Sequence, residues 1–416
     1  MPDAEESAES NGEQPSLPIV AIGASAGGLE ALQQLFGALP GDPGAAFVVI
    51  QHLARERTSM LSEILSRATT MPVVEVQSEA LVEANHVYVI PPDRDMTIEH
   101  GSLQLVVRAK DGVHRPVDRF FRGLAAERGQ KAIGVILSGT GNDGTLGLEE
   151  IKAEGGFTFA QDETAQHDGM PRNAVASGCV DLVLSPHEIA REIARVVRYP
   201  QVLGTEETAD VATKAAFAAI LKTLHHATNV DFNGYKTSTL ARRINRRMVL
   251  QKLDGLKDYA RFLSKNPDEV DALYQDILIS VTSFFRNPEL FESLKAKVFP
   301  WLAQQGSPHN SVRVWVLGCS TGEEAYSLAI AWNEFTEAEG SHVPIQIFAT
   351  DLNTTGIGKG RAGVYAKNID QDVSPERLRK FFSEVDGHYR IAKQIRDQVV
   401  FARHNVLPIR PSRMWI

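Results

Sequence analysis

The sequence has few of the features that mark secreted, metal-binding or membrane proteins. Its 416 residues hold two cysteines, Cys179 and Cys319, which are too few for a disulfide framework and form no metal-ligand spacing. No run reaches the roughly 18 apolar residues that a membrane span needs. The acidic, polar start lacks the basic and apolar regions of a signal peptide. These absences predict a cytoplasmic protein with no metal site and no direct membrane insertion.

An excess of basic residues is also missing. Lys and Arg number 43 against 52 Asp and Glu, giving a net charge of -9, which argues against a general nucleic-acid-binding protein. The composition is 43% hydrophobic and 23% charged, as in soluble globular proteins. At 416 residues, two or three domains are expected.

Short apolar runs alternate with helical patterns through residues 17–198, which predicts an α/β fold with a doubly wound, mostly parallel sheet. The strand-like runs are Ile19–Ile22, Phe47–Gln51, Val87–Ile90, Ile133–Leu137, Phe157–Ala160 and Asp181–Leu184. Helices are expected over 29–39 and 186–197, the second opening with an N-cap, a proline and a capping-box glutamate at Ser185–Glu188. A hairpin around His100-Gly101 is expected to attach to this sheet.

The rest of the chain changes pattern twice. Residues 1–16 are expected to be a disordered leader, 199–212 a linker, and 213–297 a small helical domain. Over 298–416 strands return, which predicts an incomplete Rossmann-like sheet. Its strands are Val312–Leu317, Ile345–Thr350 and Val399–His404.

The first strand runs into a small-residue turn that carries one hydroxyl, Ser25. Gly23, Ala24, Ala26, Gly27 and Gly28 surround it and leave room for backbone N–H groups to face a developing oxyanion. The pattern Gly-x-Ser-x-Gly indicates a nucleophilic serine and makes hydrolysis the first hypothesis.

Two further polar residues follow strands of the same predicted sheet. His52 comes after the second strand and Asp143 after the strand at 133–137. Because the carboxyl ends of parallel strands share one edge, Ser25, His52 and Asp143 are predicted to form a catalytic triad. Taken singly, each has a plainer interpretation: a phosphate-holding turn, a structural histidine and a turn aspartate. The chain order Ser, His, Asp disfavours the α/β-hydrolases, which have Ser, Asp, His.

The strings VAIGASAGG, VVIQHL, VYVIPPD, GVILSGTGNDGTLGL and MPRNAVASGCVDLVL resemble the catalytic domain of the CheB-type chemotaxis receptor methylesterases. The resemblance covers about residues 17–198. It implies hydrolysis of glutamyl methyl esters on receptor helices, without a cofactor, and places Ser25, His52 and Asp143 at the family's triad. It also implies deamidation of receptor glutamines. The phospho-accepting receiver domain that usually precedes this catalytic domain is not seen ahead of Leu17.

A second set of polar residues lies in the later part of the chain. Arg242, Arg243, Arg246 and Arg247 are expected to form a positive patch on one side of a helix. The segment 314–324 reads as a strand, a small-residue loop and a helix start with two glutamates, and Asp351 closes the next strand. An acidic loop suits an ammonium group and an aspartate suits ribose hydroxyls, so S-adenosylmethionine is a better candidate than NAD.

The strings RRINRRM, SVTSFFRNP, GCSTGEEAYSLA, FATDLN and HNVL resemble the CheR-type chemotaxis receptor methyltransferases. This resemblance covers about residues 213–407 and implies that the basic helix meets acidic receptor helices. Methyl-accepting chemotaxis receptors or similar sensory proteins are the implied partners. The implied cofactor contacts are Thr282 and Arg286 at the methionine end, Glu324 at the amino group, Asp351 at the ribose, and Asn405 and Val406 at the adenine.

After residue 407 the sequence departs from this family's pattern. Three strands are predicted where the family has seven, so the strand at Val312–Leu317 should have an unpaired edge. We therefore expect an intact protein-glutamate methylesterase fused to an inactive or weakly cofactor-binding methyltransferase. Two alternatives stay open at this point. One is a nucleotide-binding oxidoreductase, and the other is a catalytically dead scaffold that docks on receptors.

Overall fold

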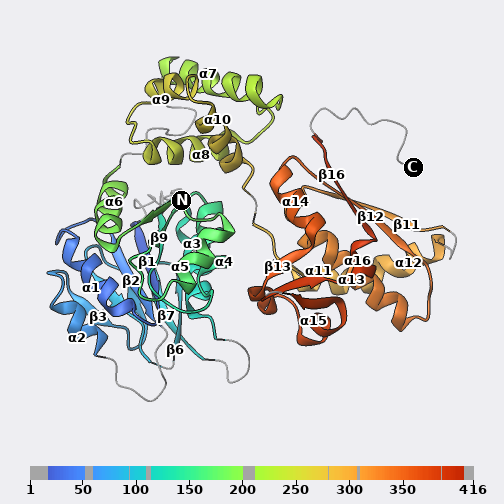
Figure 1. The fold of residues 1–416 in the computed structure, drawn as a ribbon, viewed down its shortest axis with the longest axis horizontal. Helices are drawn as coiled ribbons and strands as arrows, with labels where there is room; N and C mark the ends of the chain where they lie inside the picture. Colours follow the sequence, from blue (N-terminus) through green and yellow to red (C-terminus); the bar gives the residue numbers. More distant parts are fainter. Residues whose placement is uncertain are drawn as a thin grey trace, which may run out of the picture. The chain divides into compact units, whose positions relative to one another are not determined.

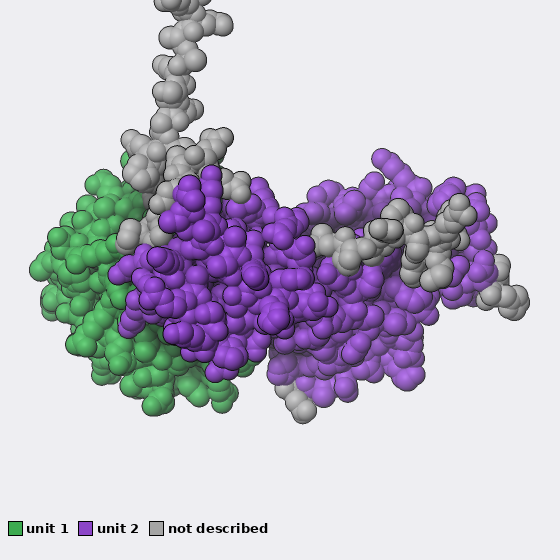
Figure 2. All heavy atoms as spheres, turned by 90° about the horizontal axis from the view of Figure 1, so that it is seen from above, with its two compact units in different colours: residues 1–200 green, residues 201–416 purple. Residues whose placement is uncertain are grey.

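The computed structural model describes residues 17–51, 60–92, 94–108, 114–199, 211–279, 281–306, 310–385 and 387–406. The predicted leader, most of the predicted linker, and His52 lie outside these ranges. The chain divides into two compact units, Met1–Pro200 and Gln201–Ile416, coloured separately in Figure 2. None of the described helices has the length and apolar character needed to cross a lipid bilayer.

The first unit is a seven-stranded sheet with the strand order β10-β9-β8-β1-β2-β5-β3, and every neighbouring pair is parallel. Its strands are β1 (Ile19–Ala24), β2 (Ala46–Gln51), β3 (Val73–Glu75), β5 (Val87–Val89), β8 (Ala132–Ile136), β9 (Phe157–Gln161) and β10 (Leu182–Leu184). The central strands β1, β2 and β8 are buried almost throughout, as expected for a parallel sheet covered on both faces. The prediction of a doubly wound α/β fold is confirmed.

Helices cover both faces of this sheet (Figure 1). They are α1 (Gly28–Ala38), α2 (Leu61–Ser66), α3 (Pro116–Arg128), α4 (Thr145–Ala153), α5 (Gly169–Ser177) and α6 (Pro186–Arg198). Helix α1 packs with α6, and α3 packs with α4. The predicted capping box of α6 is present, with the Ser185 amide donating to Glu188 at 3.1 Å.

The predicted hairpin forms, but its predicted attachment is wrong. Strands β6 (Arg94–Glu99) and β7 (Ser102–Val107) pair antiparallel around His100-Gly101. Instead of joining the parallel sheet, β7 pairs with the short strand β4 (Ala80–Leu81) in a separate three-stranded sheet. The buried side chains of Met96, Ile98 and Leu103 pack into the core beside α3, so hydrophobic burial rather than backbone pairing attaches this sheet.

The second unit begins with four helices that share a core. They are α7 (Val211–Thr228), α8 (Thr237–Leu250), α9 (Leu256–Leu263) and α10 (Pro267–Ile277). Three more helical segments follow, α11 (Pro288–Ser293), a five-residue π-helix (Leu294–Val298) and α12 (Phe299–Gln305). These segments are mainly helical, as the sequence predicts. The core shared by the first four helices ends at Ile277, however, and Phe291 of α11 packs in the core of the later sheet instead.

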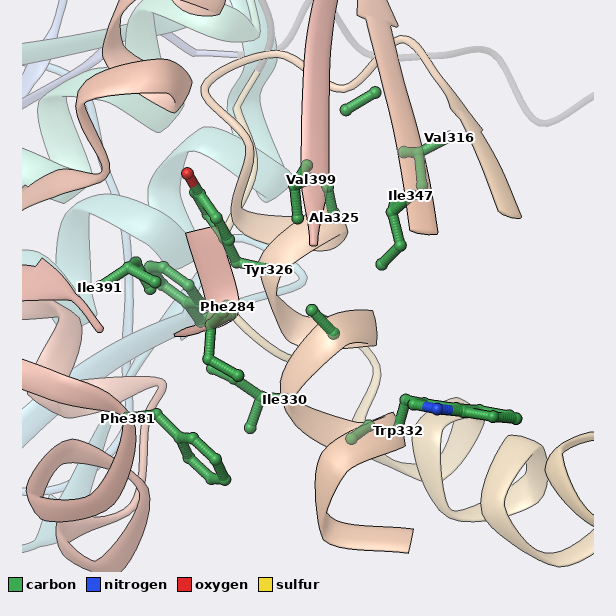
Figure 3. Close-up of a cluster of buried hydrophobic side chains, with 14 of the residues drawn as sticks. Phe284, Val316, Ala325, Tyr326, Ile330, Trp332, Ile347, Phe381, Ile391 and Val399 are labelled. Atoms are coloured by element: carbon green, nitrogen blue, oxygen red, sulfur yellow. The ribbon is translucent and has the colours of Figure 1, made fainter. Parts of the chain in front are cut away.

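A three-stranded parallel sheet, order β11-β12-β16, lies after these helices. Its strands are β11 (Val312–Leu317), β12 (Ile345–Asp351) and β16 (Val399–Arg403), and β11 is at the edge as predicted. Figure 3 shows the buried cluster that joins this sheet to α13 (Glu323–Ala338), including Val316, Ile347, Val399 and Trp332.

The other elements of this part are α14 (Thr354–Ala362), β13 (Val364–Ala366), a short 3-10 helix (Lys367–Gln371), α15 (Pro375–Phe381), β14 (Phe382–Val385), β15 (His388–Ile391) and α16 (Lys393–Arg396). Strands β13, β15 and β14 form an antiparallel sheet that the sequence analysis missed.

The prediction that the arginines of α8 form a positive surface patch is wrong, because two of them are buried. Arg243 and Arg246 are 3% and 2% exposed, and Arg246 pairs with Asp276 of α10. Arg247 donates two hydrogen bonds to the buried Glu269, which also accepts from the Tyr259 hydroxyl at 2.8 Å. Spacing along one helix could not show that acidic residues of a later helix lie against these arginines.

Loss of Asp276 is expected to destabilise this helical cluster strongly. Asp276→Ala removes the carboxylate partner of the buried Arg246, which costs about 3–5 kcal/mol. Hydrogen exchange of the α8 and α10 amides measures the local free energy of opening. The matched control is Asp258→Ala, because its partner Arg261 is exposed and such pairs contribute about 0–1 kcal/mol. Equal effects of the two variants would contradict a stabilising role for the buried pair.

Candidate active site and cofactor site

Ser25 lies in the turn between β1 and α1. Its backbone N–H donates to the Ser138 carbonyl at 3.0 Å, and its carbonyl accepts from the Gly28 N–H at 3.0 Å. Gly27 has φ +72°, a left-handed conformation that favours glycine. A Cβ added to Gly139 would lie 2.9 Å from the Cβ of Ser25, so the neighbouring loop passes close to the serine. The half-buried serine is thus held by backbone contacts in a turn that only small residues permit.

Asp143 follows β8 and is 5% exposed. Its carboxylate accepts hydrogen bonds from the Val117 N–H at 3.0 Å and the Asp118 N–H at 2.9 Å, both in the first turn of α3. The positive end of a helix dipole and two amide donors favour an anion at this position. The structure therefore fixes Asp143 as a buried, oriented carboxylate.

Ser25 and Asp143 follow adjacent strands of the sheet. Gly23 of β1 is the register partner of Ile136 of β8, so both residues lie at the carboxyl edge, as the strand-end argument predicts. On the other side of β1, Ala24 is the partner of Gln51, the last residue of β2. The carboxyl ends of β1, β2 and β8 therefore lie side by side at one edge of the sheet. The triad itself stays a prediction, because His52 is outside the described residues.

Ser138, which the sequence analysis did not single out, is fully buried between three loops. Its hydroxyl donates to the Ala26 carbonyl at 2.9 Å and accepts from the His167 N–H at 3.0 Å. Its own N–H donates to the Gln161 side chain at 2.9 Å. The signal was a small polar residue at the end of an apolar strand, directly before the glycine-rich loop that carries Asp143.

The two cysteines are poor candidates for nucleophiles. Burial raises the pKa of the Cys179 thiol to about 12, and it also raises that of Cys319 to about 12. Because the thiolate is the reactive form, both thiols are inert near neutral pH.

In the second unit, the loop between β11 and α13 contains residues in the left-handed conformation. Gly318, Ser320 and Gly322 have φ +66°, +49° and +98°, and a non-glycine residue in this region is uncommon. The Ser320 N–H donates to Asp351 Oδ2 at 2.8 Å, and the Asn353 N–H donates to Asp351 Oδ1 at 2.8 Å. Asp351 is therefore an oriented carboxylate at the end of β12, with lone pairs left for hydroxyl donors.

The segment that carries Thr282 and Arg286 has a strained backbone and is hydrogen-bonded to α13. Phe285 and Asn287, on either side of Arg286, have φ +51° and +59°, and such strain concentrates at functional sites. The Phe285 N–H donates to the Ser327 hydroxyl of α13 at 2.9 Å, which ties the segment to the helix that begins at Glu323. Thr282 is half-buried, and Arg286 is exposed with its guanidinium donating to the Val281 carbonyl at 3.0 Å.

The two glutamates at the start of α13 differ in environment. Glu324 is exposed, whereas the side chain of Glu323 accepts from the Thr321 hydroxyl at 2.6 Å. Burial raises the pKa of Glu323 to about 7. Glu324 is thus the residue with a free solvent approach, consistent with its predicted contact to an amino group.

Asn405 and Val406 follow β16, beside the end of β12. The His404 N–H donates to the Asp351 carbonyl at 2.9 Å, so these residues lie near the predicted ribose carboxylate.

Tyr235 of the helical cluster lies near this carboxylate, a neighbour that the sequence did not predict. Burial raises its pKa, and the nearby Tyr274 and Asp351 raise it further. Leu352 packs against the same helical cluster, which brings the helices to this edge of the sheet.

These features define an α/β protein with a serine-bearing strand-end site, followed by a helical cluster and a Rossmann-like domain with an acidic strand-end site. Residues 20–193 match the family model for the CheB methylesterase. Residues 215–278 match the all-alpha domain of the CheR methyltransferase, and residues 280–414 match its SAM binding domain. The chain is therefore a CheB–CheR fusion, and both resemblances seen in the sequence are confirmed.

Relatives match the whole arrangement or its first part. An "uncharacterized 104.1 kDa protein in hypE 3'region" of Rhodobacter capsulatus is 38% identical over 375 residues, which are 84% of this chain and 39% of the relative. A protein-glutamate methylesterase/protein-glutamine glutaminase of Moorella thermoacetica is 39% identical over 193 residues, 45% of this chain and 46% of the relative. The chain thus spans less than half the length of either.

Among solved structures, the CheB methylesterase catalytic domain of Thermotoga maritima is 31% identical. The match includes 98% of that domain and 43% of this chain, with a TM-score of 0.40.

Proposed function

We propose that the first unit is a protein-glutamate methylesterase that hydrolyses glutamyl methyl esters on the helices of chemotaxis receptors or similar sensory proteins. Ser25 is the nucleophile, His52 the base, and Asp143 the carboxylate that orients it. The observation that carries this proposal is the pairing of a backbone-held serine with an amide-held, buried aspartate at one edge of adjacent parallel strands.

In this reaction His52 takes the proton of the Ser25 hydroxyl while its oxygen attacks the ester carbonyl. The negative charge of Asp143 stabilises the imidazolium that forms. Collapse of the tetrahedral intermediate returns the proton to the leaving methoxide, so methanol departs and an acyl-serine remains. Water then attacks with the same histidine as base and restores Ser25 with a free glutamate. Backbone N–H groups around the small-residue turn stabilise the oxyanion.

The relatives named protein-glutamine glutaminase favour a second reaction at the same serine. An amide substrate would follow the same steps and release ammonia instead of methanol. The leaving group must then be protonated before it departs, which is the general-acid role of His52.

Methanol release from a methylated receptor fragment tests this function. The full chain should release methanol in proportion to enzyme, and a fluorophosphonate should label it and stop the release. A folded chain that binds the receptor fragment but neither releases methanol nor takes up the label would contradict the proposal and favour the docking scaffold.

We also propose that the second unit binds S-adenosylmethionine through the residues inferred from the CheR-type resemblance. The fit rests on the carboxylate of Asp351, which two backbone N–H groups orient and which keeps lone pairs as acceptors for ribose hydroxyls. The glycine-rich turn at Gly318–Gly322 lies beside it, between β11 and α13. When bound, the group would supply a methyl group for transfer to a carboxylate. The expectation that this half is inactive stays a prediction.

Removal of the Asp351 carboxylate should weaken cofactor binding. We expect Asp351→Ala to lower the affinity for S-adenosylmethionine by about tenfold or more, since hydrogen bonds to a charged group contribute about 1.5–3 kcal/mol. Calorimetric titration of the full chain measures the effect. Asp397→Ala is the control, because the ion pair of Asp397 with Lys393 is exposed to solvent. Unchanged affinity in Asp351→Ala, or no binding by the parent chain, would contradict the proposed site.

A further inference from the structure

Three loops that meet at the nucleophile are joined by the single hydroxyl of Ser138. The first is the turn of Ser25, the second is the loop after β8 that leads to Asp143, and the third runs from β9 to α5. Ser138 contacts the first through the Ala26 carbonyl at 2.9 Å and the third through the His167 N–H at 3.0 Å. Its own carbonyl accepts from the Ser25 N–H at 3.0 Å.

We infer that Ser138 is a positioning residue that fixes the Ser25 turn for ester hydrolysis, an inference that rests on the proposed esterase function. The hydroxyl sets the path of the backbone on both sides of the nucleophile, because it binds the carbonyl that follows Ser25 while its main chain binds the amide of Ser25 itself. A rotation of this turn would move the serine oxygen relative to Asp143.

The surroundings of Ser138 leave little freedom for the hydroxyl. A Cβ added to Gly27 would lie 2.7 Å from Ser138 Oγ and 2.7 Å from Gln166 Oε1, so the turn packs directly on it. Behind it, Gln161 Oε1 accepts the Ser138 N–H at 2.9 Å, and Gln161 Nε2 donates to Thr164 at 3.1 Å. Linked hydrogen bonds of this kind orient one another in a buried setting.

The chain offers a matched control at Thr158 of β9. Thr158 is also fully buried, and its hydroxyl donates to the Cys179 carbonyl at 2.7 Å and accepts from the Asp181 N–H at 3.1 Å. Ser138→Ala and Thr158→Val therefore each remove one buried hydroxyl with one donated and one accepted bond. Only the first is next to Ser25.

The test compares the two variants with the parent full chain by steady-state hydrolysis of a methylated receptor fragment and by hydrogen exchange. Ser138→Ala should lower kcat by about tenfold to a hundredfold with KM unchanged, because small misplacements of reacting groups have effects of this size. Exchange at the Ser25 and His167 amides should become about tenfold faster. Thr158→Val should alter neither quantity, although both variants lower the melting temperature.

The outcomes that contradict the role of Ser138 differ from the outcome that contradicts the esterase function. Parent-like kcat and exchange in Ser138→Ala would overturn the inference, as would an equal fall of kcat in Thr158→Val. If the parent chain released no methanol, the esterase function would fail, and the exchange rates would still show whether Ser138 holds the turn.

Discussion

Replacement of Ser25 by alanine is expected to lower kcat for methanol release by at least about 10⁴-fold, since loss of the nucleophile removes the covalent route. The fold should be unchanged, because the contacts of Ser25 with Ser138 and Gly28 are made by its backbone. Methanol assayed by gas chromatography against time gives the rate, and circular dichroism checks the fold.

The control for Ser25→Ala is the same change at Ser177 of α5, whose hydroxyl donates to the Ala174 carbonyl at 2.9 Å. Ser177→Ala should keep the parent rate. Residual activity of Ser25→Ala above a hundredth of the parent value would show that another group performs the attack.

Asp143→Asn is expected to lower kcat by about 10³–10⁴-fold, because an amide cannot stabilise the imidazolium or select its tautomer. It should also lower the melting temperature. Both oxygens of Asp143 accept backbone N–H groups of α3, so the amide nitrogen of asparagine would face one of these donors. Steady-state hydrolysis and thermal unfolding of the full chain measure the two effects.

Asp181→Asn separates these two effects. The side chain of Asp181 is only 2% exposed, accepts the Thr158 N–H at 3.0 Å and pairs with Lys152 at 3.3 Å. It should lose stability but retain kcat. If Asp143→Asn keeps more than a tenth of the parent kcat after correction for the folded fraction, Asp143 is not part of the reaction.

The sequence predicted six of the seven parallel strands, because each of these is a nearly continuous apolar run. It missed the short edge strand β3 and did not predict the order of the strands in the sheet. Such runs require burial on both faces, and that requirement alone defines the sheet and its polar edge. The positions of Ser25, Asp143 and Asp351 at strand ends followed directly.

Pairing that depends on distant segments could not be predicted. The two residues of β4 have no pattern of their own, and they form a strand only because β7 is beside them. The same holds for Arg246, whose burial depends on Asp276, thirty positions later. Ser138 was missed because its role comes from two loops that only the tertiary fold brings together.

Site mapping of a fluorophosphonate adduct tests the central claim most directly. Mass spectrometry of the labelled full chain should place one adduct on Ser25, with a rate of labelling that falls sharply in His52→Ala. A folded chain that takes up no label, or takes it up at another residue with Ser25 unmodified, would contradict the account.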